Sequence, residues 1–532
     1  MPDTEKQFFL REIERLRASL EEVLNANLLL REEIQRLKDE ISILKGQKPR
    51  PKIPPSILEG PHSKGKGKGT TDSSVSRGKH VRRKKTQHIE VHSKQRIRPE
   101  GIPEGAVFKG CLKYTVQDIV IQSHNTRYEL ERWQLPDGSY MTGEIPSNVE
   151  GHYGPRLVAY VLHQYYSCRV TEPLLLNQLR EMGILISGGQ LSNILTKGKD
   201  SFHAEKGSLL FTGISTGQIN VDDTGARHGG KNGYSTVVCN QFFTFAETTD
   251  SKSRINFLRV LHKKDPQYLV NEVAADYIES ISPSGWLKDY LLLHGNGIGR
   301  AMTQAEWDSF LLGINLREAE ERLATEAALV ASLVEKGVPL DLGVHSDDAG
   351  QFDVFVRSLC WIHEERHYRK IIPSDEEARK AIQKVRDELW SLYNGLKEYK
   401  VFPSDARKAE LSEKFDCLFL QTTSSPTLNK RLAQTYAKKE RLLRVLERPG
   451  TPLHNNGAET DIREFVTKRK VSGGTRSDDG KRCRDTFLSL KKTCIKLRIT
   501  FWNYLHDRVS KTFRLPPLSH LMEAARVVAQ PQ

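Results

Sequence analysis

Long apolar runs are missing from this 532-residue sequence, and no window approaches the roughly 18 apolar residues that a membrane-spanning helix requires. The first residues also lack the basic region and apolar run of a secretory signal. The seven cysteines are scattered, and no two of them form a CxxC pair. This spacing argues against a disulfide framework and against a four-cysteine zinc ribbon. We therefore expect a cytoplasmic protein that binds no zinc.

Acidic residues are outnumbered, because 67 Asp and Glu stand against 81 Lys and Arg and leave a net charge of +14. Residues 62–100 alone hold twelve Lys or Arg and three acidic residues. They lie in a segment, residues 47–103, whose Pro, Gly and Ser content is typical of a linker without a core. Its densest basic run is Arg82, Arg83, Lys84 and Lys85. We expect this linker to bind nucleic-acid phosphates without sequence preference; a solubilising tether is the alternative.

The first 46 residues have a seven-residue apolar repeat. Its a positions are Ile13, Leu20, Asn27, Ile34 and Ile41, and leucine fills most d positions. Isoleucine at a with leucine at d favours a parallel two-stranded coiled coil. A single polar a residue, here Asn27, fixes register and strand number. The repeat predicts dimerisation through residues 1–46, and an amphipathic helix packed on its own domain is the alternative.

Residues 104–210 combine strand-like and helical patterns. Residues 107–122 and 126–140 are typical of short strands, and Asp137-Gly138 indicates a hairpin turn. Further on, Thr171 and Ser187 are suitable caps for two short helices separated by Gly183, which resembles a helix-turn-helix. If this region reads DNA, the second helix offers Gln190, Asn193 and Lys197 for contact. Plain packing of a helical hairpin is the alternative.

Three acidic positions stand at the ends of regular elements. A strand-like run ends in Asp222-Asp223, ahead of a hairpin turn expected at residues 231–233, and a second apolar run ends in Asp347-Asp348. Glu459 falls one turn into a helix that Asn455 or Asn456 is suited to cap. A single acid near a strand end is usually a solvated turn residue. Three of them in the order strand, strand and helix favour a shared site.

The sequences around these acids resemble the DDE transposases of bacterial insertion sequences, and most of all the insertion-sequence-66 type. The matching runs are VDDTGARHGG, SDDAGQF followed by CWIHEERHYRK, and NNGAETDIR. The resemblance covers about residues 105–515. It implies an α/β RNase H-like catalytic core at residues 211–515 with a helical insertion at about 374–446, followed by a tail at residues 516–532. Ahead of the core it implies an N-terminal coiled coil and a small DNA-binding region at residues 104–210.

The resemblance also implies the roles of the acids. Asp222 would bridge two Mg²⁺ ions, Asp347 would hold one and Glu459 the other, with Mn²⁺ as an alternative metal. Two such ions activate an oxygen nucleophile and stabilise the leaving oxygen in phosphodiester chemistry. Asp223 and Asp348 remain alternatives to their neighbours, since one residue of strand register decides which carboxylate points inward.

Basic residues follow Glu459 and are suited to hold DNA phosphates. They are Arg463, Lys468, Arg469 and Lys470. A solvated helix face is the alternative. Cys360 and His363 are expected to be structural, although His363 and Arg366 could instead approach the reacting phosphate. The cysteine-rich zinc segment of better-known family members is missing here, because only Cys111 lies in the corresponding interval.

The sequence therefore predicts a transposase that cuts the ends of an insertion sequence and joins 3′-hydroxyl strands to target DNA. Its expected partners are double-stranded DNA, a second copy of the chain and accessory transposition proteins, and its expected location is the nucleoid. A DNA-binding regulator that has lost the chemistry is one alternative. A nuclease of the same fold that hydrolyses without joining is another.

Overall fold

The computed structural model describes residues 90–529, apart from 147–148, 150, 264, 283–284 and 296–298. The predicted coiled coil and the basic run Arg82–Lys85 lie outside the described residues. Residues 90–126 belong to one compact unit, and residues 127–529 belong to a second, larger one. Among the described helices, none is long and apolar enough to span a bilayer.

The strands expected at residues 107–122 do not form. This segment has neither helix nor strand, and its apolar side chains are exposed, including Leu112 and Val120. Strand propensity is not sufficient here, because a strand needs a partner and a surface on which to bury one face. The hairpin expected at Asp137-Gly138 is confirmed. It joins β1 (Arg132–Gln134) to β2 (Tyr140–Thr142), and the Asp137 carboxylate accepts a hydrogen bond from the Ser139 amide at 2.9 Å.

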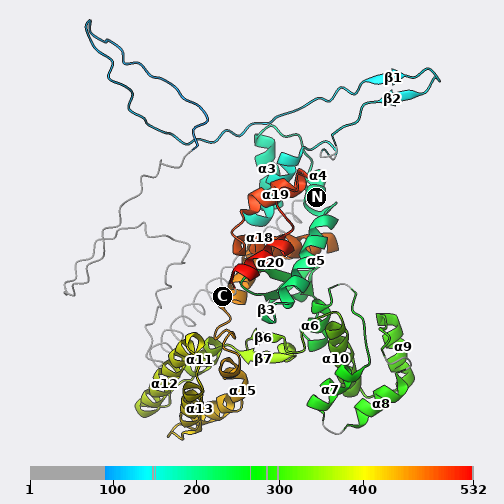
Figure 1. The fold of residues 1–532 in the computed structure, drawn as a ribbon, viewed down its shortest axis with the longest axis vertical. Helices are drawn as coiled ribbons and strands as arrows, with labels where there is room; N and C mark the ends of the chain where they lie inside the picture. The colour runs from blue at the N-terminus through cyan, green and yellow to red at the C-terminus, as the bar shows by residue number, and fades with distance from the viewer. Residues whose placement is uncertain are drawn as a thin grey trace, which may run out of the picture. The chain divides into compact units, whose positions relative to one another are not determined.

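A five-stranded mixed sheet lies at the centre of the larger unit (Figure 1). Its strands are β3 (Gln218–His228), β4 (Lys231–Cys239), β5 (Thr244–Thr249), β6 (Gly343–Ser346) and β7 (Val356–Leu359). The order across the sheet is β5-β4-β3-β6-β7. The first three strands are antiparallel, whereas β6 and β7 run parallel to β3. This mixed α/β arrangement is compatible with the RNase H-like core that the sequence predicts.

The turn between β3 and β4 differs from the expected one. It consists of Gly229 and Gly230, with φ values of 54° and 80°, and residues 231–233 already pair within β4. Glycine adopts these left-handed values without steric cost, which lets the two strands pair up to His228 and Lys231. Both strands are therefore long, and β3 continues past Asp222 to His228, so the expectation that this strand ends in Asp222-Asp223 is wrong.

Helices from both ends of the unit pack around the sheet. Ahead of it lie α2 (Pro155–Leu162), the π-helical η1 (His163–Ser167), α3 (Glu172–Glu181), α4 (Gly188–Thr196) and α5 (Asp200–Ile214). After it lie α17 (Asn456–Ser472), α18 (Asp478–Lys496), α19 (Phe501–Val509) and α20 (Leu518–Ala529). Helix α17 packs on β3 and β4 through a small apolar cluster that includes Val237, Ala458 and Phe465. This contact brings the start of α17 close to Asp222.

Helix α18 covers the outer edge of β5. Its Asp485, Ser489 and Thr493 side chains accept hydrogen bonds from the amides of Thr248, Ala246 and Thr244, at 2.8, 3.0 and 3.0 Å. Four helical residues rise about 6 Å and two strand residues span about 6.6 Å, so the two periods match. The edge strand thus has its free amides paired, which prevents it from pairing with another chain.

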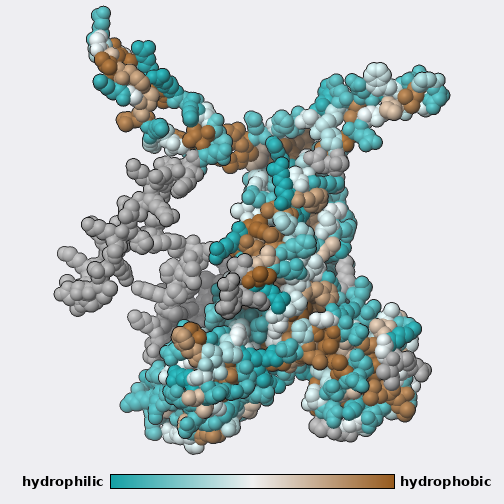
Figure 2. All heavy atoms as spheres, viewed as in Figure 1, coloured by the Kyte–Doolittle hydropathy of each residue, from teal (hydrophilic) through white to brown (hydrophobic). Residues whose placement is uncertain are grey.

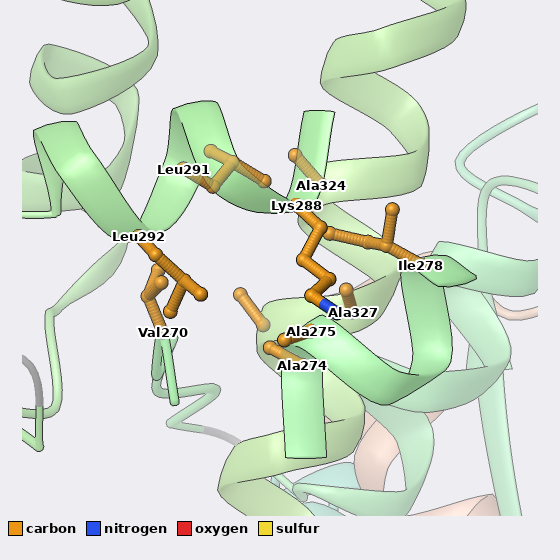
Figure 3. Close-up of a pocket in the computed structure, with 10 residues that line it drawn as sticks. Val270, Ala274, Ala275, Ile278, Lys288, Leu291, Leu292, Ala324 and Ala327 are labelled. Atoms are coloured by element: carbon orange, nitrogen blue, oxygen red, sulfur yellow. The ribbon is translucent and has the colours of Figure 1, made fainter. Parts of the chain in front are cut away.

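Two groups of helices lie in the chain after strands of the sheet, one between β5 and β6 and one after β7 (Figure 1). Between β5 and β6 lie α6 (Arg254–Leu261), α7 (Glu272–Ile281), α8 (Trp286–His294), α9 (Gln304–Ile314) and α10 (Glu318–Glu335). Helices α7, α8 and α10 enclose a small apolar pocket, lined among others by Ala274, Ile278 and Leu291 (Figure 3). None of its lining residues is acidic.

The second group follows the short helix η2 (Gly350–Phe352), strand β7 and helix α11 (Trp361–Arg369). It comprises α12 (Glu376–Val401), α13 (Asp405–Leu420), α14 (Pro426–Tyr436), α15 (Lys439–Leu442) and α16 (Arg444–Glu447). These helices have an apolar core of their own, which includes Leu389, Phe415 and Leu432. Their outer surface is mostly hydrophilic (Figure 2).

Candidate active site

Strand β3 presents its two aspartates on opposite faces of the sheet, because successive strand residues alternate. Asp222 pairs with Val237, a residue of the cluster beneath α17. Asp223 points the other way, where its carboxylate forms an ion pair with Lys252 at 2.8 Å and accepts a hydrogen bond from Gln351. Asp222 is therefore the aspartate that faces the helix carrying Glu459.

Asn455 connects that helix to the strand. Its side-chain amide donates to the carbonyl oxygen of Val221 at 2.9 Å, and its side-chain oxygen accepts a hydrogen bond from Asn220 at 3.0 Å. Its backbone amide also contacts the Cys360 sulfur at 3.2 Å. Asn455 occupies the N-cap position of α17, but its side chain makes no cap hydrogen bond, contrary to the expected capping role. The side chain holds the first turn of α17 against β3 instead.

Asp347 lies beside Asp222 through the sheet register. Asn220 pairs with His345 in the parallel β3–β6 ladder, and each aspartate stands two residues further along its chain. The Asp347 carboxylate accepts the Ala349 amide at 3.1 Å, and Arg357 donates to the Asp347 carbonyl oxygen at 3.0 Å. The neighbouring Asp348 is exposed and forms an ion pair with Lys438 at 2.6 Å.

The pKa of Asp222 reflects its burial and the other carboxylates near it. Burial raises the pKa of its carboxyl from 3.8 to about 7. A hydrogen bond from the Asp223 amide opposes the rise, whereas the negative charges of Asp347, Asp223 and Glu459 add to it. Four carboxylates thus lie within electrostatic reach of one another. Such repulsion is unfavourable for folding and is typical of sites that bind cations or transfer protons.

Glu459 lies in the first turn of α17, with 13% of its side chain exposed. The nearest nitrogens to its Oε1 atom are those of Arg366 at 3.4 Å and His363 at 3.6 Å, and Arg463 lies 3.5 Å from Oε2. Oε1 is nevertheless buried without a hydrogen bond. Burial lowers the pKa of His363, and the adjacent Arg366 lowers it further. His363 is therefore a neutral neighbour of Glu459 at pH 7, while Arg366 carries the positive charge.

The carboxylates fit a divalent cation in their chemistry. Oxygen ligands are those that Mg²⁺ prefers, and the Oε1 atom of Glu459, which accepts no hydrogen bond, offers one. A cation would also relieve the repulsion that raises the pKa of Asp222. Within the described residues, no three acidic, His or Cys side chains already stand at ligand spacing. Asp222, Asp347 and Glu459 are thus candidate ligands whose side chains have to move closer together to share an ion.

Helices α3 and α4 form where the sequence predicts two short helices. Ser187 caps α4 and exchanges hydrogen bonds with Gln190 in a capping box. The candidate contact residues Asn193 and Lys197 are exposed, although Lys197 forms an ion pair with Asp479. Gln190 is also exposed, but its side chain is occupied by the cap and by the Tyr153 hydroxyl.

The basic residues of α17 differ in exposure. Arg463 and Lys470 are exposed and Arg469 is half-buried. Lys468 contradicts the expectation of a DNA-facing side chain, because it is buried, lies over the ring of Tyr165 and donates to the Tyr165 carbonyl oxygen at 3.0 Å. Burial lowers its pKa to about 8. One helix face buries Lys468 and the opposite face leaves Lys470 in solvent.

Sequence reasoning missed several residues of this region. Lys252 and Gln351 hold Asp223 away from the other acids, while Arg357 and Lys438 hold the loop that carries Asp347. Apart from the contact of Arg357, which spans ten residues, these contacts join distant parts of the chain, and of the four residues only Gln351 lies in a motif quoted above. The structural role expected for Cys360 agrees with its burial and its contact with Asn455.

Two comparisons relate this chain to known proteins. The model of the Transposase IS66 family matches residues 349–483, which include α11, the second helical group and Glu459. Uncharacterized protein y4jO of Sinorhizobium fredii is 39% identical over 316 residues, which cover 58% of this chain and 98% of that protein. No solved structure matches. The chain belongs to the IS66 transposase family.

Proposed function

We propose that this protein is a Mg²⁺-dependent DDE transposase that cuts the ends of an insertion sequence and transfers 3′-hydroxyl strands to target DNA. The observation that carries the proposal is the convergence of Asp222, Asp347 and Glu459. They come from β3, from the loop after β6 and from the first turn of α17, and both partners raise the pKa of Asp222. The RNase H-like core predicted from the sequence is part of this proposal.

Each carboxylate has a defined role in it. Asp222, Asp347 and Glu459 would hold the divalent ions. When bound, such ions neutralise charge on the attacking and leaving oxygens of a phosphodiester. Asn455 keeps Glu459 near Asp222 by binding α17 to β3.

Arg366 is the cationic side chain nearest to Glu459. A guanidinium group forms paired hydrogen bonds with phosphate oxygens, so Arg366 is suited to orient the reacting phosphate once Glu459 binds a metal ion. The neutral imidazole of His363 lies 3.0 Å from an Arg366 nitrogen and limits the directions in which that guanidinium can point. These residues position the phosphate and leave the nucleophile to water or a DNA 3′-hydroxyl.

The N-terminal segments outside the described residues, together with α4, complete the proposal. Dimerisation through residues 1–46 would bring two active sites to the two ends of one element. The basic run Arg82–Lys85 would bind DNA phosphates in a salt-dependent way, and α4 would contact DNA through Asn193 and Lys197. Action on DNA places the protein at the nucleoid.

The test is strand cleavage and joining on labelled DNA that carries the ends of the element encoding this chain, with Mg²⁺ present. Asp222→Asn, Asp347→Asn and Glu459→Gln should each abolish both reactions without weakening DNA binding. Asp223→Asn and Asp348→Asn are matched controls of equal charge change and should retain activity.

Three other outcomes would overturn the proposal. Activity that survives the first three substitutions would place the chemistry elsewhere. Binding of the ends without cleavage would favour a regulator, and cleavage without joined products would favour a nuclease.

A further inference from the structure

Helix α11 lies between the proposed active site and the second helical group. It carries Arg366, the nearest cation to Glu459, and it packs against α12 and α14. Its first residue is fixed at both ends of its side chain and backbone, because the Trp361 ring nitrogen donates to the Leu442 carbonyl oxygen and the Trp361 amide to that of Leu453, each at 3.0 Å. The direction in which Arg366 points therefore depends on how the rest of α11 is held.

The two sides of α11 have different surroundings. Glu364, Glu365 and Tyr368 are buried, whereas His363 and Arg366 are only partly buried. Successive helix residues are rotated by about 100°, so Arg366 and His363 each lie about 150° from the direction midway between the two glutamates. The glutamates thus face the second helical group, and the opposite side of α11 faces Glu459.

Helix α14 and the residues directly after it hold one edge of the buried side. The Glu364 carboxylate accepts a hydrogen bond from the Thr435 hydroxyl at 2.5 Å and forms ion pairs with Arg431 and, at 3.3 Å, with Lys438. The Tyr368 hydroxyl, one turn further along α11, lies 2.6 Å from the same Thr435 hydroxyl. These contacts pull this edge of α11 towards α14.

Helix α12 holds the other edge. Two nitrogens of Arg386, Nε and Nη2, lie 2.8 and 2.7 Å from the Oε1 atom of Glu365. Glu364 and Glu365 are adjacent and therefore about 100° apart around the helix. A rotation of α11 in either direction would stretch the contacts of one of them. The two glutamates together fix the rotation of α11 about its axis.

The ion pairs of these glutamates supply direction more than stability. A buried ion pair adds little net stability over an apolar pair of similar volume, because the loss of hydration offsets the attraction. Hydrogen bonds between charged groups are directional, whereas apolar contacts are not. A helix that must aim a side chain at a reacting group is held more accurately by such bonds than by apolar packing alone.

We infer that Glu364 and Glu365 are positioning residues, which fix the rotation of α11 and thereby hold Arg366 towards the reacting phosphate. The second helical group thus acts in the reaction as the support of Arg366. The role of Arg366 at the phosphate rests on the proposed function, whereas the anchoring of α11 by the two glutamates does not.

The pair Glu365–Arg386 is the better one to test, because Lys438 contacts Asp348 as well as Glu364. Glu365→Leu with Arg386→Met replaces the pair by apolar side chains. In the full chain with Mg²⁺, the rate of single-turnover cleavage of the element ends should fall by about tenfold to a hundredfold, with unchanged DNA affinity. In an Arg366→Gln background the same double substitution should have no further effect. An equal loss in both backgrounds would overturn the inference.

A matched control removes another ion pair from the same helical group. Arg407 and Glu398 join α13 to α12 at 3.1 Å, and within the described residues neither forms an ion pair or a hydrogen bond with α11. Arg407→Met with Glu398→Leu should keep the original cleavage rate. Arg386→Lys keeps a cation beside Glu365 and should also retain most of the rate. A loss in the control as large as in the test variant would overturn the inference.

Hydrogen exchange in EDTA, without DNA, tests the anchoring independently of any reaction. In the Glu365→Leu, Arg386→Met variant the amides of residues 365–369 should exchange about tenfold faster, while the urea midpoint stays close to the original. Unchanged exchange in α11 would overturn the anchoring. Glu365→Gln keeps the size of the side chain and weakens the pair, so it should show the same effects where the double variant folds poorly.

Failure of the inference and failure of the proposed function give different results. Cleavage that survives the substitutions of Asp222, Asp347 and Glu459 would refute the proposed function, and the exchange of α11 would still report the anchoring. Essential carboxylates without coupling between Arg366 and the Glu365–Arg386 pair would refute the inference alone.

Discussion

Replacing Asp222 with Asn should stabilise the metal-free protein, and the gain should grow with pH. Burial and three neighbouring carboxylates raise the pKa of Asp222 from 3.8 to about 7. Each pKa unit corresponds to about 1.4 kcal/mol, so the ionised side chain costs the folded state up to about 4 kcal/mol at pH 7 and above. Asn has the same size and never ionises, so it avoids this cost.

The direction in which stability changes with pH follows from proton binding to Asp222. Between about pH 4 and pH 7 the unfolded chain has lost the Asp222 proton while the folded chain keeps it. The unfolded state then binds fewer protons, so the free energy of unfolding falls as the pH rises through this window. Below pH 4 both states are protonated and the cost disappears. Above pH 7 it is fully present.

The assay is urea unfolding in EDTA at pH 5.5 and at pH 8. The difference in free energy of unfolding between Asp222→Asn and the original protein should be larger at pH 8, by about 2 kcal/mol. Asp223→Asn is the control and should give no gain, because it removes the ion pair with Lys252. Added Mg²⁺ should stabilise the original protein at pH 8 more than the Asn variant. A difference that is equal at both pH values would refute the crowded carboxylate site.

Two further substitutions test how the site is held. Asn455→Ala should lower the free energy of unfolding by about 1–3 kcal/mol and slow strand cleavage, because it leaves the Val221 carbonyl and the Asn220 side chain without a hydrogen bond. Full activity with full stability would contradict the role of Asn455 in positioning α17. Ser489→Ala should cost about 1–2 kcal/mol by leaving the Ala246 amide without a partner. Hydrogen exchange at that amide should quicken, and unchanged protection would show that the edge of β5 is not sealed by α18.

Local features of the fold could be predicted from the sequence because their hydrogen bonds are local. Asp137-Gly138 forms the expected turn, and Ser187 caps α4, since each involves residues within three positions of one another. The insertion-sequence-66 resemblance was equally visible from short motifs and is confirmed by the family match. The acids within β3, after β6 and in the first turn of α17 belong to those same motifs.

Features that depend on packing could not be predicted. Residues 107–122 have strand-like composition but lack a partner, so they form no strand. Lys468 belongs to a basic run, yet its side chain is buried and lies over the ring of Tyr165. Asn455 was suited to cap a helix, but β3 lies close enough to take its side chain.

The choice between the neighbouring aspartates Asp222 and Asp223 shows most clearly what is local in the sequence and what depends on packing. The sequence by itself determined that an acidic pair belongs to a strand, because composition and order are local properties, but it placed the pair at the end of the strand and the pair lies in the middle of β3. Only the tertiary structure decided that Asp222 faces α17 and that Asp223 pairs with Lys252. The physical reason is that adjacent strand residues point to opposite faces, and the identity of each face depends on helices folded from distant parts of the chain.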